Sequence, residues 1–317
     1  MASLSRLNTT LRHQPTDAQR PPLPIVAPAG GYLSRGSNPS EQSVKLKEFF
    51  YLMGLKPKPV HYGFVVEAHE ILGEGRIEVA RWLHPQAYSA VPDSQYIRNL
   101  RRFLREGDVA IDIGAHVGDS AIPIALAVGR TGMVLALEPN PFVFPVLREN
   151  AALNRDRTNI VPLQIAATRT DGPVVFKYAE RGFCNGGIHE GISRWVHGSA
   201  YEVTVAGRYL PRLLAERDPD LASRVRFIKT DAEGYDLAIL ESLNDLIRRQ
   251  RPYLQVEFFN ARKSPPEYRR RLHAFLAGAG YRVRRVQERD PQFLAEDITA
   301  DNLFALKSYD VFCVPAP

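Results

Sequence analysis

From Val109 onward, short apolar runs of β-favouring residues alternate with amphipathic stretches of helical period. This alternation is typical of a parallel sheet covered by helices on both faces. The principal strands are expected at Val109–Ile113, Met133–Leu137, Ile160–Ile165, Val225–Lys229, Tyr253–Phe258, Tyr281–Val286 and Tyr309–Val314. The main helices are expected at Asp119–Val128, Phe142–Leu153, Tyr235–Arg249 and Pro266–Ala277. The sequence therefore predicts a doubly wound, Rossmann-like α/β sheet built from these seven strands.

Two segments precede this α/β domain, which we expect to span residues 106–317. Residues 1–42 are rich in Pro, Ser, Thr and Arg and show no apolar period, so we expect a disordered arm there. Residues 43–105 mix strand and loop patterns and end in a helix expected at Ser94–Arg105. We interpret them as an N-terminal extension that packs on the domain or forms a lid over it.

Composition limits the compartment and the partners. The chain contains no apolar run of the ~18 residues that a membrane span needs, and no apolar stretch of a secretory signal. Its two cysteines, Cys184 and Cys313, provide no disulfide framework, so we expect a cytoplasmic protein. The net charge of +6 comes from arginine runs in predicted helices with acidic neighbours, which indicates solvated helix faces rather than a nucleic-acid groove. A homo-oligomer is compatible with this composition.

A glycine turn stands between the first predicted strand and the first helix. It reads Asp-Ile-Gly-Ala-His-Val-Gly from Asp112 to Gly118, and Gly114 lets the backbone approach a ligand at a helix N-terminus. Glu138 ends the second strand 24 residues after Gly114. An acidic side chain at that place can accept hydrogen bonds from both hydroxyls of an adenosine ribose. The pattern therefore predicts a site for an adenosine-containing cofactor.

Asp112 distinguishes two cofactors that fit this pattern. The pyrophosphate of a nicotinamide dinucleotide would be repelled by the Asp112 carboxylate at the turn. S-adenosylmethionine has no phosphate and carries an ammonium and a sulfonium, which a carboxylate favours. Ala115 and Val117 also stand where a dinucleotide fingerprint has glycines. We therefore expect S-adenosylmethionine, and a nicotinamide-dependent oxidoreductase is the alternative.

Several segments together resemble one protein family. They are the turn from Asp112 to Gly118, the strand end Leu137–Pro141, the pair Asn150 and Asn154, and Phe227–Asp236 with its Lys-x-Asp-x-Glu-Gly motif. Over Asp108–Phe259 the chain is similar to the FkbM methyltransferases. The resemblance implies the class I methyltransferase fold, whose sheet has an antiparallel last strand. It also implies an enzyme that methylates a hydroxyl of a sugar, glycan or natural product. A methyltransferase acting on RNA or protein is a further alternative.

The resemblance also implies the residues that hold the donor. The methionine part would be held by Asp112, Gly114, Ala115 and Gly118, the ribose by Glu138 beside Pro139 and Asn140, and adenine by Ala166 or Ala167. His116 stands where an asparagine is common in the family. We interpret His116 as a residue of the cofactor turn that is hydrogen-bonded locally, rather than as a base.

Acidic side chains are expected to meet beyond the carboxyl ends of the strands. Transfer to a hydroxyl requires removal of its proton, so a carboxylate near the acceptor can act as general base. Asp231 is the first candidate, and Glu257 ends the next strand. Glu233 either acts as base too or caps the following helix, because acids stabilise helix N-termini. Lys229 is placed to pair with one of these acids.

Two further features leave alternatives open. The irregular segment Tyr178–Tyr201 is either an acceptor-binding segment or an ordinary surface loop, and its His189 is an alternative base. Asp231, Glu257 and Asn260 offer the oxygen ligands that Mg²⁺ prefers. These three residues do not form a specific metal signature, so we favour a site without a divalent metal.

Overall fold

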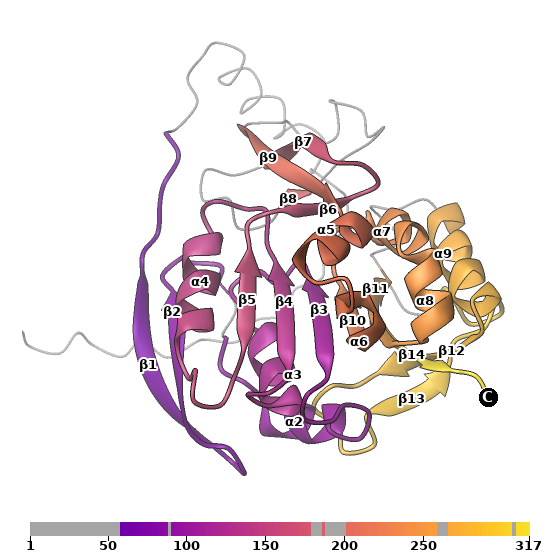
Figure 1. Cartoon of the computed structure of the whole chain (residues 1–317), viewed down its shortest axis with the longest axis horizontal. Coiled ribbons are helices and arrows are strands. Elements are labelled where there is room, and N and C mark those ends of the chain that lie inside the picture. Colours follow the sequence, from indigo (N-terminus) through magenta and orange to yellow (C-terminus); the bar gives the residue numbers. More distant parts are fainter. Residues whose placement is uncertain (1–57, 88–89, 179–185, 188–200, 259–265, 306–308) are drawn as a thin grey trace, which may run out of the picture. The chain divides into compact units, whose positions relative to one another are not determined.

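An eight-stranded sheet organises the described part of the chain, as the computed structural model shows (Figure 1). Its strands in spatial order are β13 (Leu294–Asp297), β12 (Tyr281–Val286), β14 (Tyr309–Pro315), β11 (Tyr253–Phe258), β10 (Val225–Thr230), β3 (Val109–Ile113), β4 (Met133–Leu137) and β5 (Ile160–Leu163). Strands β5, β4, β3, β10 and β11 are parallel, and β14 runs antiparallel between β11 and β12. The predicted doubly wound sheet with an antiparallel last strand is confirmed, and β13 is an edge strand that the sequence analysis missed.

The structure describes residues 58–87, 90–178, 186–187, 201–258, 266–305 and 309–317, which all belong to the unit Lys47–Pro317. The predicted arm at residues 1–42 and the candidate residues His189 and Asn260 lie outside these ranges. Within them, no helix has both the length and the apolar character that a membrane crossing requires.

Helices cover both faces of the main sheet. One face packs against α2 (Ser94–Leu100), α3 (Ala121–Val128) and α4 (Phe144–Ala152). The other packs against α5 (Leu210–Arg217), α6 (Leu221–Arg224), α7 (Asp236–Ser242), α8 (Asn244–Gln250) and α9 (Pro266–Gly278). Every residue of β3 is buried, with Ala110 in the first core and Ile111 in the second. Successive strand residues point to opposite faces, so a strand buried on both faces reads as a continuous apolar run.

The helix predicted at Tyr235–Arg249 is in fact two helices. Leu243 separates α7 from α8 and is fully buried, with φ −95° and ψ 8°. The hydroxyl of Ser242 donates to the carbonyl of Ile239 at 2.6 Å. A serine hydroxyl that bonds a carbonyl of the preceding turn competes with the helical backbone, and the interruption directly follows this serine.

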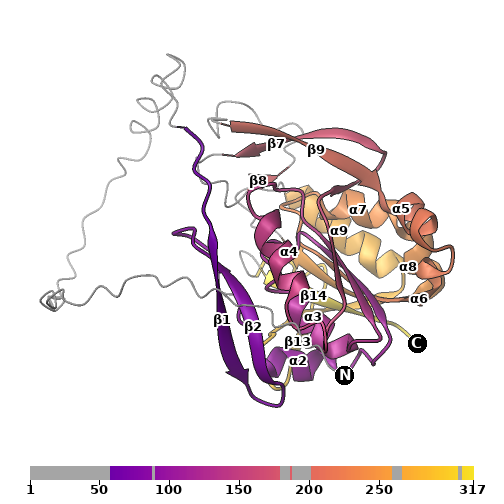
Figure 2. The same ribbon diagram turned by 60° about the vertical axis from the view of Figure 1, so that its left-hand side comes forward.

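Two smaller sheets accompany the main one. The hairpin of β1 (Phe64–Ile71) and β2 (Gly75–Trp82) lies along α4 (Figure 2). The second sheet has the order β6 (Ala166–Thr168), β9 (Tyr201–Tyr209), β7 (Gly172–Tyr178), β8 (Gly186–Gly187). It lies beyond the carboxyl ends of the parallel strands, at the top of Figure 1. This second sheet therefore covers the edge at which a ligand of an open α/β sheet is expected.

Candidate functional site

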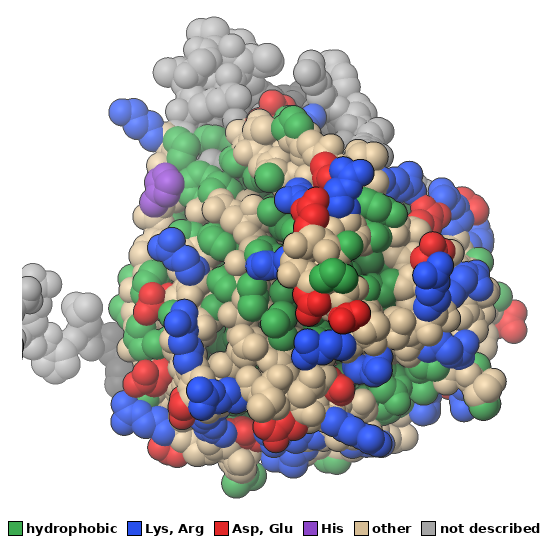
Figure 3. All heavy atoms as spheres, in the orientation of Figure 1, with side chains coloured by type: hydrophobic (Ala, Val, Ile, Leu, Met, Phe, Trp, Pro, Cys, Tyr) green, Lys and Arg blue, Asp and Glu red, His purple; other side chains and the backbone are tan. Residues whose placement is uncertain are grey.

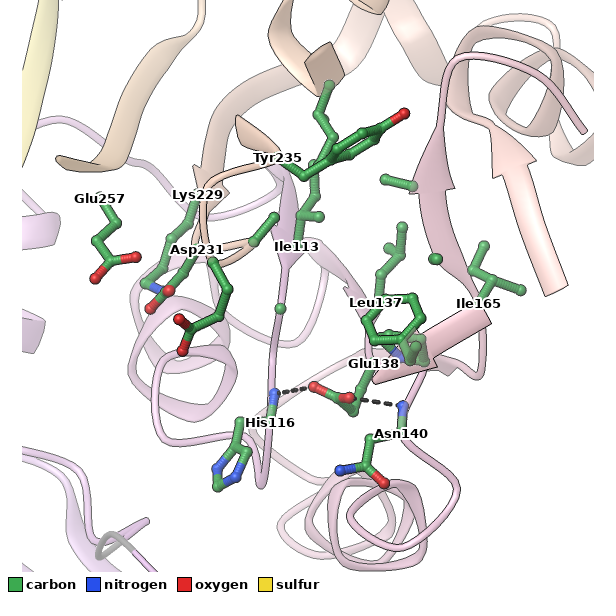
Figure 4. Close-up of a pocket in the computed structure, with 18 of the residues that line it drawn as sticks. Ile113, His116, Leu137, Glu138, Asn140, Ile165, Lys229, Asp231, Tyr235 and Glu257 are labelled. Carbon is green, nitrogen blue, oxygen red and sulfur yellow. Dashed lines mark hydrogen bonds and ion pairs between the residues drawn. The ribbon is translucent and has the colours of Figure 1, made fainter. Parts of the chain in front are cut away.

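A cavity of about 380 Å³ lies at the carboxyl ends of β3, β4 and β10 (Figure 4). Its volume is within the range of ~300–1,000 Å³ that is usual for small-molecule sites. The predicted site residues that line it are Gly114, His116, Glu138, Pro139, Asn140, Ala166, Ala167, Asp231, Glu233 and Glu257. The fold thus brings the predicted donor-binding residues and the predicted catalytic acids into one cavity.

Gly114 has φ +81°, a conformation that side chains disfavour. A Cβ atom there would lie 2.1 Å from the carbonyl oxygen of Asp231. The N–H groups of Gly114 and Ala115 both donate to the carbonyl of Leu137 at 3.0 Å. The glycine is therefore required because the ends of β10 and β4 approach the turn closely, a packing reason that the sequence analysis did not anticipate.

Glu138 is the most firmly held acid of the cavity. Its Oε2 accepts the backbone N–H of His116 at 2.9 Å, and its Oε1 accepts that of Asn140 at 2.8 Å (Figure 4). Burial raises the pKa of Glu138 to about 7, although both N–H groups act to lower it. His116 occupies the left-handed region with φ 47°, which aims its N–H at the carboxylate. The local bonding expected of His116 thus involves its backbone.

Three residues expected to hold the methionine part do not line the cavity. Asp112 near the end of β3, and Ala115 and Gly118 within the turn, are all buried. Asp112 accepts a hydrogen bond from the Ser120 hydroxyl at 2.7 Å, and its Oδ1 has no hydrogen-bond partner among the described residues. Burial raises the pKa of Asp112 to about 6, and the charge of Lys229 opposes that rise. Asp112 therefore faces the protein interior, because β3 is covered on both sides.

The other end of the cavity is acidic around one buried cation. Lys229 Nζ lies 3.3 Å from Oδ2 of Asp231, so the predicted pairing is present. Burial alone would lower the pKa of Lys229, but the charges of the surrounding acids, first Asp231 and Asp112, together outweigh it and raise that pKa well above its ordinary value. Burial, and then the charge of Asp231, raise the pKa of Glu257 to about 9. Oε2 of Glu257 is buried and has no hydrogen-bond partner within the described ranges.

Asp236 organises the turn that carries Glu233. Its carboxylate accepts the Thr230 hydroxyl at 2.7 Å and the backbone N–H groups of Ala232 at 2.9 Å and Gly234 at 3.2 Å. Glu233 itself has φ 50° and lines the cavity, and Asp236 is the acid in the first turn of α7. Glu233 was expected either to act as a base or to cap this helix, and Asp236, two residues beyond the Lys-x-Asp-x-Glu-Gly motif, was not predicted to bond the turn.

The second sheet adds an aromatic wall. Phe176 and Tyr178 of β7 line the cavity opposite the main sheet, near Ile165 and Ala166. They are two residues apart on one strand, so their side chains share a face. That spacing is visible in the sequence, although Phe176 was not among the predicted site residues.

Among the described residues, no group of three or more His, Cys, Asp or Glu side chains is arranged to hold a metal ion.

Comparison with known proteins identifies the family. The family model described as the methyltransferase FkbM domain matches residues 112–283, more than half of the chain. No curated protein matches the chain.

Solved structures give distant likenesses. The methyltransferase FkbM from Methylobacillus flagellatus KT is 15% identical, with a TM-score of 0.39, over 66% of this chain and 44% of that chain. This chain therefore spans less than half the length of that protein. Fibrillarin from Aeropyrum pernix, in complex with natively bound S-adenosyl-L-methionine, is 16% identical, with a TM-score of 0.40, over 81% and 99% of the two chains. Precorrin-6y C5,15-methyltransferase from Geobacter metallireducens GS-15 is 13% identical, with a TM-score of 0.39, over 74% and 95%. On the match over residues 112–283, the chain belongs to the FkbM methyltransferase family.

Proposed function

We propose that this protein is an S-adenosylmethionine-dependent methyltransferase that methylates a hydroxyl of a small molecule, such as a sugar, glycan or other natural product. The observation that carries the proposal is the Glu138 carboxylate, held by the backbone N–H groups of His116 and Asn140 at the cavity. Each of its oxygens keeps acceptor capacity for one hydroxyl. The two adjacent hydroxyls of a ribose match that arrangement.

The rest of the donor site follows from the lining. Ile165, Ala166 and Ala167 form an apolar end beside Glu138, which suits adenine. Asp231 and Glu233 place negative charge at the other end, where we locate the ammonium and the sulfonium. When bound, S-adenosylmethionine supplies a methyl group on positively charged sulfur.

Asp231 is the general base in this proposal. Its carboxylate lines the cavity, and Lys229 fixes one of its oxygens at 3.3 Å. Asp231 accepts the proton of the acceptor's hydroxyl group while the hydroxyl oxygen takes the methyl group from the donor. Glu257 has a pKa of about 9 and is protonated at neutral pH, so it donates a hydrogen bond to the acceptor rather than serving as the base.

The same charges disfavour RNA as the acceptor. The cavity is lined by Asp119, Glu138, Asp231, Glu233 and Glu257, with Lys229 as the lysine among them. Glu257 is protonated at neutral pH, but the carboxylates of Asp119, Asp231 and Glu233 still outnumber Lys229 there. A phosphate beside the reacting group would therefore meet an excess of negative charge. On the face seen in Figure 3, Lys and Arg side chains are dispersed among Asp and Glu rather than gathered in one patch. We therefore propose a neutral or cationic small molecule over RNA.

Calorimetric titration of the full-length protein with S-adenosylmethionine and NAD tests the donor assignment. We expect binding of the first alone, and binding of NAD alone would overturn the proposal in favour of an oxidoreductase. Incubation of hydroxylated sugars and polyketides with radiolabelled S-adenosylmethionine then tests the acceptor class. Label found only in methyl esters or N-methyl groups, and in no methyl ether, would contradict methylation of a hydroxyl.

The compartment is a further part of the proposal. Cys313 is a buried free thiol, and burial raises its pKa. A thiol kept in this state suits a reducing compartment, and we propose the cytoplasm.

A further inference from the structure

Asn150 of α4 joins two elements that lie far apart in the sequence. Its Nδ2 donates to the carbonyl of Val117 at 2.7 Å and to that of Ala80 at 3.0 Å. Its Oδ1 accepts the backbone N–H of Ala80 at 2.6 Å. The side chain is 1% exposed, so losing these partners would leave polar groups buried without hydrogen bonds.

Asn154, four residues later, makes the same pair of hydrogen bonds to β2 but none to the turn. Its amide accepts the N–H of Glu78 at 3.0 Å and donates to the carbonyl of Glu78 at 2.8 Å. Glu78 and Ala80 alternate along β2, so the two asparagines pair with one edge of that strand as a neighbouring strand would. Only Asn150, of the two, also reaches the glycine turn.

Packing reinforces the same connection. Trp82 at the end of β2 is buried, and its ring meets that of His116 edge to face at 5.8 Å. Ala115 and Val117 belong to the same apolar core as Ile77 and Trp82 of the hairpin. The hairpin therefore supports the inner side of the turn whose outer side faces the cavity.

We propose that Asn150 is a positioning residue of the donor site and that the hairpin β1–β2 acts through it. Asn150 fixes the carbonyl of Val117, and the neighbouring His116 N–H then holds Oε2 of Glu138 at 2.9 Å. The hairpin lies in the predicted N-terminal extension, and none of the extension's described residues (58–87 and 90–105) lines the cavity. The extension thus acts from behind the turn. This inference rests on the proposed binding of S-adenosylmethionine.

Two matched variants test the proposal by titration calorimetry with S-adenosylmethionine. Asn150→Ala removes the bonds to both β2 and the turn, whereas Asn154→Gly removes only bonds to β2 and tolerates the φ of +54° at that position. We expect the Kd to rise roughly tenfold in Asn150→Ala, as the loss of one buried hydrogen bond implies. In Asn154→Gly it should stay within about twofold. If the alanine variant does not fold, Asn150→Ser provides the same comparison with a smaller cavity.

A double-mutant cycle with Glu138→Gln separates positioning from general destabilisation. Because Asn150 acts through Glu138, the two changes should weaken binding by less together than the product of their separate effects. Independent effects, or equal affinities of wild type and Asn150→Ala, would overturn this inference and leave the proposed function standing. Wild-type protein that binds no S-adenosylmethionine would overturn both.

Discussion

Replacement of Glu138 by glutamine tests the central contact of the proposed donor site. The carboxylate accepts one backbone N–H on each oxygen, from His116 and from Asn140. Glutamine has a single side-chain oxygen, so one of these N–H groups would face an NH₂ group instead. The ribose hydroxyls would also lose an ionised acceptor.

The magnitude follows from these bonds. A hydrogen bond to a charged group contributes about 1.5–3 kcal/mol. Losing one such bond to the donor raises the Kd for S-adenosylmethionine by roughly 10- to 100-fold. Glu78→Gln on β2 is the matched control, because this side chain is exposed and does not line the cavity. We expect no change of affinity in the control.

The pH dependence of S-adenosylmethionine binding is a second test of the role of Glu138. With a pKa of about 7, the Glu138 carboxyl is protonated below neutral pH and ionised above it. If the ionised form accepts the ribose hydroxyls, the Kd rises about tenfold between about pH 8 and about pH 6. Titration calorimetry of both proteins across this range measures the effect. A wild-type Kd that does not change with pH, or a glutamine variant that binds as tightly as wild type, would refute the reasoning.

Three other changes probe the turn, the base and the acidic end. Gly114→Ala should abolish donor binding and lower the Tm, because its Cβ would lie 2.1 Å from the Asp231 carbonyl oxygen. Gly73→Ala is the control, since Gly73 has a similar φ of +86° but no atom within 4 Å of the added Cβ. In thermal melts the control should lower the Tm less. Asp231→Asn should slow methyl transfer by about 10²–10⁴-fold in initial rates at saturating donor, and an unchanged rate would exclude it as the base. Glu257→Gln should raise the Tm more at about pH 8 than at about pH 5. A carboxyl whose pKa rises from 4.5 to about 9 on folding costs stability as pH increases through that range, and equal gains at both pH values would contradict this assignment.

The parallel strands were predictable because their burial leaves a simple pattern. Strand β3 is apolar throughout except for Asp112, and it begins and ends where the sequence analysis placed it. The antiparallel last strand and the cavity at the strand ends followed from the family pattern and from the general rule for open α/β sheets. Glu138 and Asp231 reached the cavity because each stands at the carboxyl end of a strand.

Other features depend on contacts between distant segments and leave little trace in the sequence. The hairpin β1–β2 is held by the side-chain amides of Asn150 and Asn154, which a reading of local periodicity does not connect to residues 78–80. Residues Leu294–Asp297 form a short edge strand with only partial burial, so β13 lacks an apolar run. The break at Leu243 falls inside a continuous helical pattern and is marked only by the Ser242 hydroxyl, which bonds the Ile239 carbonyl.

The charges that disfavour a dinucleotide lie in the cavity lining and not at Asp112, where they were expected. The Asp112 carboxylate is buried, with a pKa of about 6, and lines no part of the cavity. The charge that a pyrophosphate would meet belongs instead to Asp119, just ahead of α3, and to Asp231 and Glu233 across from it. The glycine turn also has few free N–H groups for a phosphate, because those of Gly114 and Ala115 donate to Leu137 and that of His116 donates to Glu138. We therefore expect that Asp112→Asn does not bind NAD. If NAD binds once Asp119, Asp231 and Glu233 are changed to amides, then these three lining residues are what excludes a dinucleotide.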